Sequence, residues 1–199
     1  TEPAKGKLYN ILYPFDINDI SKGGLTVATS RPETLFGDVA VCVNPDDGRY
    51  KKLVGKSVFI PIINKQIPVI SDSAVELDFG TGCLKITPAH DANDYEIFSR
   101  CKNQILEKDY IEIMSPKGTI HDKNNLGIPA DILGQERFKA REITVAKLEE
   151  LGFLKEVKEY DQPSAKHDRC GTVIEPYLSE QWYVKMKPLA GPAIKVVED

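Results

Sequence analysis

The sequence has few of the residues on which several classes of protein depend. Its 199 residues include only four cysteines (Cys42, Cys83, Cys101 and Cys170), and their spacing forms no pairs. This pattern argues against a disulfide framework and indicates reduced thiols in an intracellular, cytoplasmic protein. No apolar run approaches the length of a membrane span, and the first residues do not resemble a signal peptide. We therefore expect no membrane partner.

An excess of positive charge is also absent. The chain has 26 Lys and Arg residues against 30 Asp and Glu residues, which gives a net charge of −4. This balance argues against a protein that holds nucleic acid by bulk electrostatics. A nucleic-acid end presented to a small pocket stays open as a substrate, provided that other contacts or another domain hold the backbone.

The hydrophobic pattern predicts many short strands and few helices. Alternating or uniformly apolar runs predict strands over residues 7–13, 25–29, 39–43, 57–63, 66–70 and 153–160. Helical spacing predicts helices over residues 92–103 and 134–152, and residues 181–186 look extended. Short strands of this density with little helix predict an α+β, predominantly β fold, with a barrel or closed sheet.

A glycine-rich turn and a short strand form the stretch around which the polar residues gather. The turn at residues 80–82 allows the chain to reverse tightly before the strand. Because side chains alternate along a strand, Lys85 and Thr87 are expected to share one face, with Leu84 and Ile86 facing a core. The strand is therefore expected to present a cation and a hydroxyl to the start of the next helix.

Two carboxylates stand at that helix start. Asp91 suits the N-cap position, and Asp94 stands three residues later, where an acidic side chain can close a capping box. Both carboxylates would then be structural. Alternatively, they complete a polar cleft with Lys85 and Thr87. Neither role excludes the other for Asp91, so both interpretations stay open.

A second polar cluster follows the strand at residues 25–29. Ser30 and Glu33 fit a capping box, and Gly37 would end the helix after little more than one turn. This pattern gives no structural reason for Arg31 and Thr34. A short helix set against a strand end could project both side chains into a cleft.

Several other kinds of site fit the sequence poorly. The glycine-rich turn lacks the spacing of a phosphate-binding loop. His90, Asp91 and Asp94 fall short of the ligand set of a hydrolytic metal site. His167 and Cys170 form only half of a zinc site, and no serine stands on a nucleophile elbow. We therefore expect no metal ion.

Two segments carry a resemblance to a known family. Thr29-Ser30-Arg31-Pro32-Glu33-Thr34, followed by Gly37-Asp38-Val39-Ala40-Val41, resembles the first signature of the editing domain inserted in class I valyl-tRNA synthetases. Gly80-Thr81-Gly82 through Lys85-Ile86-Thr87-Pro88-Ala89-His90-Asp91, closing with Asn93-Asp94-Tyr95-Glu96, is similar to its second signature. The resemblance covers nearly the whole chain. The family usually has threonine where Ser30 stands, which keeps the hydroxyl.

The resemblance implies a fold and an activity. Residues 1–176 would be the editing domain, a compact mixed β-barrel with peripheral helices. Residues 177–199 would be a segment returning toward the synthetic core. The domain would hydrolyse mischarged threonyl-tRNA(Val) by water attack in a polar pocket that rejects valine. Its partners would be the tRNA(Val) 3′ end carrying threonine and the synthetic core of the same chain. The alternative is a non-catalytic module that holds the tRNA end or docks on a larger synthetase.

The resemblance also implies roles for residues. Asp94 would bind the α-ammonium group of the substrate, and Asp91, Lys85 and Thr87 would complete the catalytic pocket. The other expected substrate-binding residues are Thr29, Ser30, Arg31, Glu33, Thr34, Gly80, Thr81, Gly82 and His90. No cofactor is expected in this domain, because ATP and Mg would serve the catalytic core, whose HIGH-like and KMSKS-like motifs this chain lacks. The general base stays open, and a ribose hydroxyl of the tRNA is one alternative.

Overall fold

The computed structural model of the chain describes residues 2–198. The strands are β1 (Glu2–Pro14), β2 (Gly24–Thr29), β3 (Ala40–Val43), β4 (Ser57–Ile60), β5 (Lys65–Ser71), β6 (Cys83–Ile86) and β7 (Leu154–Ser164). The α-helices are α1 (Ala92–Arg100), α2 (Arg137–Glu150) and α3 (Met186–Glu198). Short 3-10 helices are η1 (Ile20–Lys22), η2 (Pro32–Gly37) and η3 (Lys51–Leu53). The predicted strands and helices are therefore present with other ends: β1 and β7 extend beyond the predicted strands, whereas α1 and α2 are shorter than the predicted helices.

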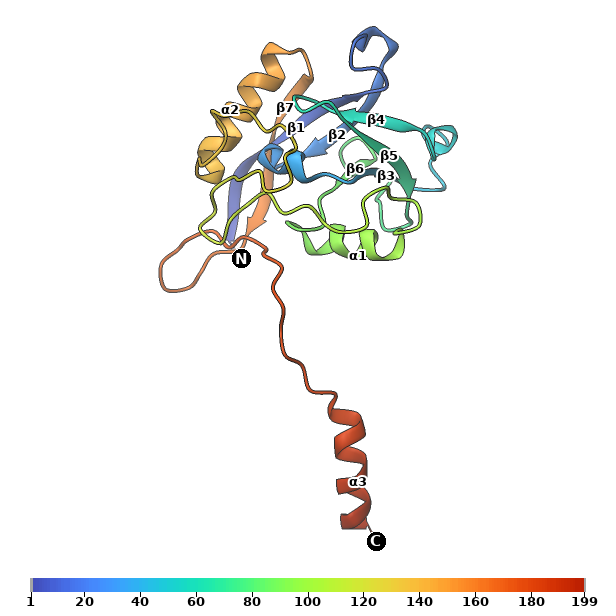
Figure 1. The fold of residues 1–199 in the computed structure, drawn as a ribbon, viewed down its shortest axis with the longest axis vertical. Helices are drawn as coiled ribbons and strands as arrows, with labels where there is room; N and C mark the ends of the chain where they lie inside the picture. The colour runs from blue at the N-terminus through green and yellow to red at the C-terminus, as the bar shows by residue number, and fades with distance from the viewer. Residues whose placement is uncertain (1, 199) are drawn as a thin grey trace.

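The strands form two sheets within residues 2–198 (Figure 1). One sheet is antiparallel, in the order β2-β1-β7. The other has the order β4-β5-β3-β6, in which β3 runs parallel to β5 and antiparallel to β6. The edge strands β2 and β6 lie beside each other without sharing a hydrogen-bond ladder. The α+β fold with mostly sheet is confirmed, whereas the predicted closed barrel is not supported.

The core lies around β3 and explains why that strand is central. All residues from 39 to 43 are fully buried, as a run that is apolar on both faces predicts. The largest fully buried side chains include Tyr13, Phe36 and Phe98, which come from three separate elements. At the sheet edge β4 ends at Ile60, one residue before Pro61, which has no N–H to donate to a ladder. The predicted strand 57–63 was therefore too long.

The predicted capping box at the second polar cluster is wrong. Arg31 is the N-cap of η2, and no side chain caps this helix. Glu33 is fully buried and accepts two hydrogen bonds from Arg141 of α2, from Nε at 2.8 Å and from NH2 at 2.7 Å. A bidentate pair between charged groups is stronger than a single capping bond. Glu33 therefore joins α2 to η2 and does not reach back to Ser30.

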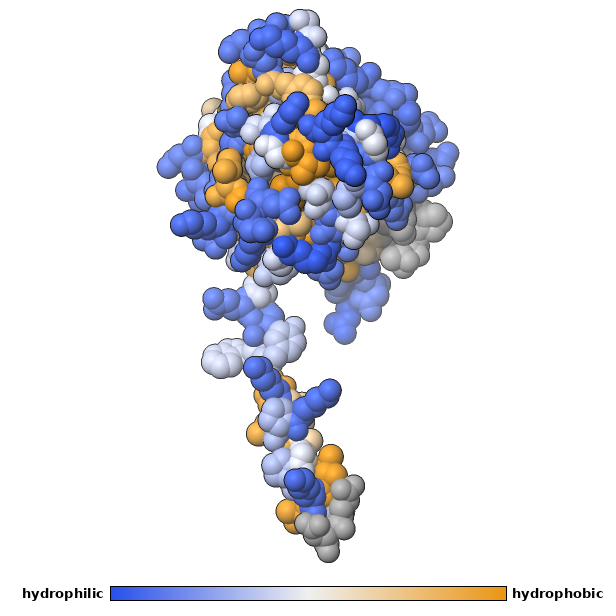
Figure 2. All heavy atoms as spheres, turned by 90° about the vertical axis from the view of Figure 1, so that its right-hand side faces the viewer, coloured by the Kyte–Doolittle hydropathy of each residue, from blue (hydrophilic) through white to orange (hydrophobic). Residues whose placement is uncertain are grey.

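The C-terminal segment lies apart from the sheets. Residues 181–185 are in neither helix nor strand, and α3 extends away from the rest of the chain (Figure 1). Figure 2 shows apolar side chains exposed along this tail, where Trp182 is 100% exposed and Val197 is 87% exposed. Helix α3 was not predicted, because Gly191 and Pro192 lower helix propensity. The division after residue 176 stays a prediction.

No helix between residues 2 and 198 combines the length and the apolar composition that crossing a membrane requires.

The pair between Glu33 and Arg141 gives a prediction about stability. Arg141→Met should lower the free energy of unfolding by about 3 kcal/mol, because it leaves a fully buried carboxylate without its main partner. Lys139→Met on the same helix is the matched control, since its partner Glu142 is 69% exposed, and it should change stability by less than about 0.5 kcal/mol. Urea denaturation measures both. Similar small losses in the two variants would contradict a structural role for the buried pair.

Candidate functional site

A cavity of about 220 Å³ brings most of the predicted site residues together. It opens between the edge strands of the two sheets, with Ala28 and Thr29 from β2 and Leu84 and Lys85 from β6 in its walls. A ladder between these strands would leave no such space, so the open edge makes the site. The predicted residues that line it are Thr29, Ser30, Arg31, Thr34, Lys85, Thr87, His90, Asp91 and Asp94.

The strand β6 places its side chains only partly as alternation predicts. Ile86 is fully buried in the core, as expected. Leu84 is half-buried and lines the cavity, although it packs on the core as well. Lys85 is buried, with 7% of its side chain exposed. Alternation predicted the direction of Lys85 but not its burial, which depends on what packs above the strand.

The ammonium group of Lys85 is held by three oxygens. Its Nζ donates to Thr34 Oγ1 at 2.8 Å, to Asp38 Oδ1 at 3.2 Å and to Thr87 Oγ1. The group does not bond to the carboxylates of the helix start, contrary to the expectation that it would face them. A buried charge needs a partner and full hydrogen bonding, and this one has both. Lys85 is therefore a fixed part of the cavity floor.

Asp38, which contacts the cavity floor, was not predicted from the sequence as a site residue. It is fully buried, and it accepts hydrogen bonds from Tyr13 Oη at 2.6 Å and from Thr87 Oγ1 at 2.5 Å as well as from Lys85. Burial raises the pKa of Asp38, and the charge of Lys85 and the three hydrogen bonds oppose that rise. A signal was present, since a carboxylate directly before a strand that is apolar on both faces needs a buried partner.

Asp91 and Asp94 have different roles at the start of α1. Asp91 is the N-cap, as predicted, because its Oδ1 accepts from the backbone N–H of Asn93 at 2.9 Å and of Asp94 at 3.2 Å. Asp94 does not close a capping box, since its Oδ2 accepts from the backbone N–H of Thr87 at 2.8 Å. That bond turns the carboxylate toward β6 and the cavity. Within the described part of the chain, Asp94 Oδ1 has no hydrogen-bond partner.

Burial also changes the acidity of Asp94. The side chain is 6% exposed, and this desolvation raises its pKa to about 7, against the lowering effect of the Lys85 charge. The nearby charge of Asp91 adds to the rise. The carboxylate therefore changes its charge near neutral pH. A cation that entered the cavity would favour the ionised form.

His90 forms hydrogen bonds through both its ring and its backbone carbonyl. Its ring Nε2 accepts from the backbone N–H of Ile113 at 3.1 Å, and its carbonyl oxygen accepts from Arg31 NH1 at 2.7 Å. Burial, together with the charges of Arg31 and Lys85, lowers the pKa of His90 to about 4. The ring is therefore neutral at pH 7, and its Nε2 is already used as an acceptor. Within residues 2–198, no three His, Cys, Asp or Glu side chains are grouped to hold a metal ion.

Arg31 lines the cavity but is tied to distant residues. Besides the His90 carbonyl, its guanidinium bonds to the carboxylate of Glu175, which also lies 3.0 Å from Arg137 Nε. Glu175 stands 144 residues from Arg31 in the sequence, and no local pattern could have paired them. The segment that leaves the sheets therefore contacts the wall of the site.

Four predicted substrate-binding residues lie outside the cavity. Glu33 pairs with Arg141, and Gly80, Thr81 and Gly82 form a turn beside the cavity. Gly80 has φ +58°, and a Cβ there would come within 2.7 Å of the Ala28 Cβ. The glycine is thus required by close packing of the turn on β2.

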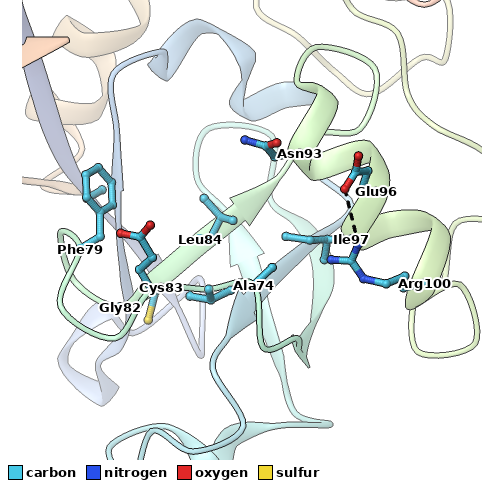
Figure 3. Close-up of a pocket in the computed structure, with 12 residues that line it drawn as sticks. Ala74, Phe79, Gly82, Cys83, Leu84, Asn93, Glu96, Ile97 and Arg100 are labelled. Carbon is cyan, nitrogen blue, oxygen red and sulfur yellow. Dashed lines mark ion pairs between the residues drawn. The ribbon is translucent and has the colours of Figure 1, made fainter. Parts of the chain in front are cut away.

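Figure 3 shows residues that line a second, larger cavity of about 440 Å³. This cavity adjoins the first. The two share Ala28, Phe79 and Leu84, and the larger one extends along α1 past Asn93. Phe79 is 45% exposed and packs edge-to-face against Tyr160, with ring centroids 6.0 Å apart. Neither aromatic residue was predicted at the site. An exposed Phe in a loop before the glycine turn was the available signal.

Comparison with known proteins shows a strong similarity to a curated protein. No family model matches the chain. The chain is 48% identical over 197 residues to valine–tRNA ligase of Clostridium tetani, which covers 99% of this chain. The same residues make up 21% of that relative. The chain thus spans about one fifth of the length of the ligase that it resembles.

The raised pKa of Asp94 predicts a pH-dependent stability. The folded state holds this proton up to about pH 7, whereas an unfolded Asp releases it near pH 4, so stability falls as pH rises between these values. Asp94→Asn cannot ionise and keeps an oxygen for the Thr87 N–H. The difference in free energy of unfolding between this variant and the wild type should therefore shift in favour of the variant. The shift should reach up to about 1.4 kcal/mol for each pH unit from pH 5 to pH 7.

Urea denaturation at pH 5, 6, 7 and 8 measures this gain. Asp72→Asn is the control, because Arg100 lowers the pKa of Asp72 and its effect on stability should be constant above pH 5. A difference between Asp94→Asn and the wild type that does not change with pH would contradict the raised pKa.

Proposed function

We propose that the chain is a post-transfer editing domain that hydrolyses the ester of threonyl-tRNA(Val). The observation that carries this proposal is the buried Asp94 carboxylate, which keeps one oxygen without a partner in a polar cavity. Such a carboxylate can hold an α-ammonium group through a charge-assisted hydrogen bond. The similarity to a valine–tRNA ligase supports a role on a product of that class of enzyme.

The cavity has the size and lining for one small polar amino acid. Its volume of about 220 Å³ lies below the roughly 300–1,000 Å³ of pockets for drug-sized ligands. Threonine and valine have the same shape, and a hydrophobic pocket rejects a hydroxyl-bearing isostere only weakly. Valyl-tRNA synthetase facing threonine is the established example of this weakness. A polar cavity instead favours threonine over valine, because valine would leave the hydrogen-bonding groups of the cavity desolvated and unpaired.

The residues around the cavity have different roles in hydrolysis. Asp94 holds the ammonium group and so fixes the position of the ester carbonyl beside it. Asp91 uses only Oδ1 for capping, so its Oδ2 is available to accept a hydrogen from the attacking water. The hydroxyls of Thr29 and Ser30 donate no hydrogen bond among the described contacts and can donate to the developing oxyanion. Water adds to the carbonyl carbon, the bond to the ribose oxygen breaks, and that oxygen takes the proton.

The adjoining cavity suits the terminal nucleoside. An aminoacylated end needs two neighbouring spaces, and the 440 Å³ cavity meets the smaller one at Phe79 and Leu84. An exposed aromatic ring such as Phe79 can stack on a base, and stacking tolerates any base. The net charge of −4 offers no strong attraction to the tRNA backbone, which the synthetic core of the parent chain would hold.

The alternative is a non-catalytic module that holds the tRNA 3′ end or docks on a larger synthetase. The exposed apolar side chains of residues 182–197 favour docking of that segment. Docking alone gives no reason for a buried carboxylate beside an open cavity. The two functions differ in turnover, because a docking module would bind the tRNA end and release it unchanged.

Deacylation of charged tRNA tests the proposal. The chain should release threonine from threonyl-tRNA(Val) much faster than valine from valyl-tRNA(Val). Asp94→Asn should slow the first reaction about 10- to 100-fold, because a hydrogen bond to a charged group is worth roughly 1.5–3 kcal/mol. Asp131→Asn, whose carboxylate pairs with Lys147 of α2 and lines neither cavity, is the control and should keep the rate. Binding without turnover in the wild type would favour the docking module.

Chelation tests the expectation that no metal takes part. The carboxylates at the cavity and the neutral His90 do not form a group that could ligate an ion. Deacylation of threonyl-tRNA is therefore expected to survive prolonged treatment with EDTA. A loss of activity that added zinc restores would refute hydrolysis by a water that protein side chains alone position.

A further inference from the structure

Lys85, at the floor of the cavity, has no N–H left to donate to a ligand. An ammonium group carries three N–H donors and no acceptor. All three donors of Lys85 are used, since they point to Thr34 Oγ1 at 2.8 Å, Asp38 Oδ1 at 3.2 Å and Thr87 Oγ1. Lys85 could therefore donate to a substrate only by giving up one of these partners.

The hydroxyl hydrogens of Thr34 and Thr87, also at the floor, are already used in hydrogen bonds. Thr87 Oγ1 donates its hydrogen to Asp38 Oδ1 at 2.5 Å, and Thr34 Oγ1 donates to the Arg31 carbonyl oxygen at 2.9 Å. Each hydroxyl also accepts one bond from Lys85. A hydroxyl has one hydrogen and two lone pairs. Each oxygen therefore keeps one lone pair, and neither has a hydrogen left for a ligand.

Asp38 fixes this arrangement. Its Oδ2 accepts from Tyr13 Oη at 2.6 Å, while its Oδ1 accepts from Thr87 and Lys85. Both oxygens thus act as acceptors in a fully buried position, and the side chain donates nothing. A leucine in this place would offer no acceptor. The Thr87 hydroxyl would then lose its acceptor and could turn its own hydrogen toward the cavity.

We propose that Asp38 is a positioning residue that makes the cavity floor an acceptor only, so that the site selects a side chain that donates a hydrogen bond. The inference rests on the proposed editing function and names what that site requires of its substrate. A threonine hydroxyl can donate to Thr34 or Thr87, whereas valine offers no donor. A side chain whose oxygen can only accept forms no hydrogen bond with the floor. It should therefore bind no more tightly than a hydrocarbon side chain of the same size.

Binding of four ligands to the unchanged chain tests this directly. The ligands are adenosine analogues in which an amide replaces the 3′ ester, so that they cannot be hydrolysed as the ester would be. Threonyl and valyl analogues form one pair of equal size that differs by a hydroxyl donor. O-methylthreonyl and isoleucyl analogues form a second pair of equal size that differs by an oxygen that only accepts. Calorimetry gives the dissociation constant of each.

The threonyl analogue should bind about tenfold or more tightly than the valyl analogue, since a hydrogen bond is gained. The O-methylthreonyl and isoleucyl analogues should differ by less than about twofold. An advantage of O-methylthreonyl over isoleucyl, or equal binding of threonyl and valyl, would overturn the inference. Because these ligands report binding, their ranking is independent of whether threonyl-tRNA is hydrolysed, which tests the proposed function.

A variant adds a second readout. Asp38→Leu should make the O-methylthreonyl analogue bind about tenfold or more tightly than the isoleucyl analogue, because the freed Thr87 hydroxyl can then donate to the ether oxygen. A variant that merely loses structure would bind neither the threonyl analogue nor this pair. Asp47→Leu is the matched control, since Asp47 is also a buried carboxylate paired with a cation, Arg49, and does not line the cavity. Its two dissociation constants should differ by less than about twofold, and the same small difference in an Asp38→Leu chain that still binds the threonyl analogue would contradict the inference.

Discussion

The structure around the site depends on the buried pair of Asp38 and Lys85. Their charges lie 3.2 Å apart at the floor of the cavity, where neither could remain ionised alone. Tyr13 joins the pair from β1 of the first sheet, and Lys85 joins it from β6 of the second. The hydrogen bonds of Asp38 thus connect two sheets that share no ladder. Removing either charge would leave the other buried without compensation.

The open edge between the sheets is the second constraint. A ladder between β2 and β6 would satisfy their backbone groups but would fill the space that Asp94 faces. Pro88 lies just after β6 and cannot donate to a ladder, which helps to keep that strand short. The bond from the Thr87 N–H to Asp94 instead joins the strand end to α1. The fold therefore gives up sheet closure at the place where a ligand can enter.

Features that depend on neighbouring residues could be predicted from the sequence. The central strand β3, the cap of α1 by Asp91 and the left-handed Gly152 directly after the C-cap of α2 follow from local patterns and agree with the structure. Pairs between distant residues could not be predicted. Glu33 and Arg141 are 108 residues apart, and a capping box was the only local partner for that carboxylate. For the same reason, most residues predicted for the site line one cavity, while Asp38 and Glu175, which bond to Lys85 and Arg31, were not predicted.

The charges of the cavity explain how an acidic chain can present a selective site. Lys85 is balanced by Asp38 and Arg31 by Glu175, and His90 is neutral because burial lowers its pKa. The carboxylates of Asp91 and Asp94 are then the charges without a cation among the lining residues. Burial lifts the pKa of Asp94 to about 7, so the site gains most from a ligand that brings a positive charge. The α-ammonium group is the cation on an aminoacylated tRNA end, and an end without an amino acid has none. Under the proposed function, the desolvation of Asp94 that lowers the stability of the fold at neutral pH therefore also restricts the cavity to aminoacylated tRNA.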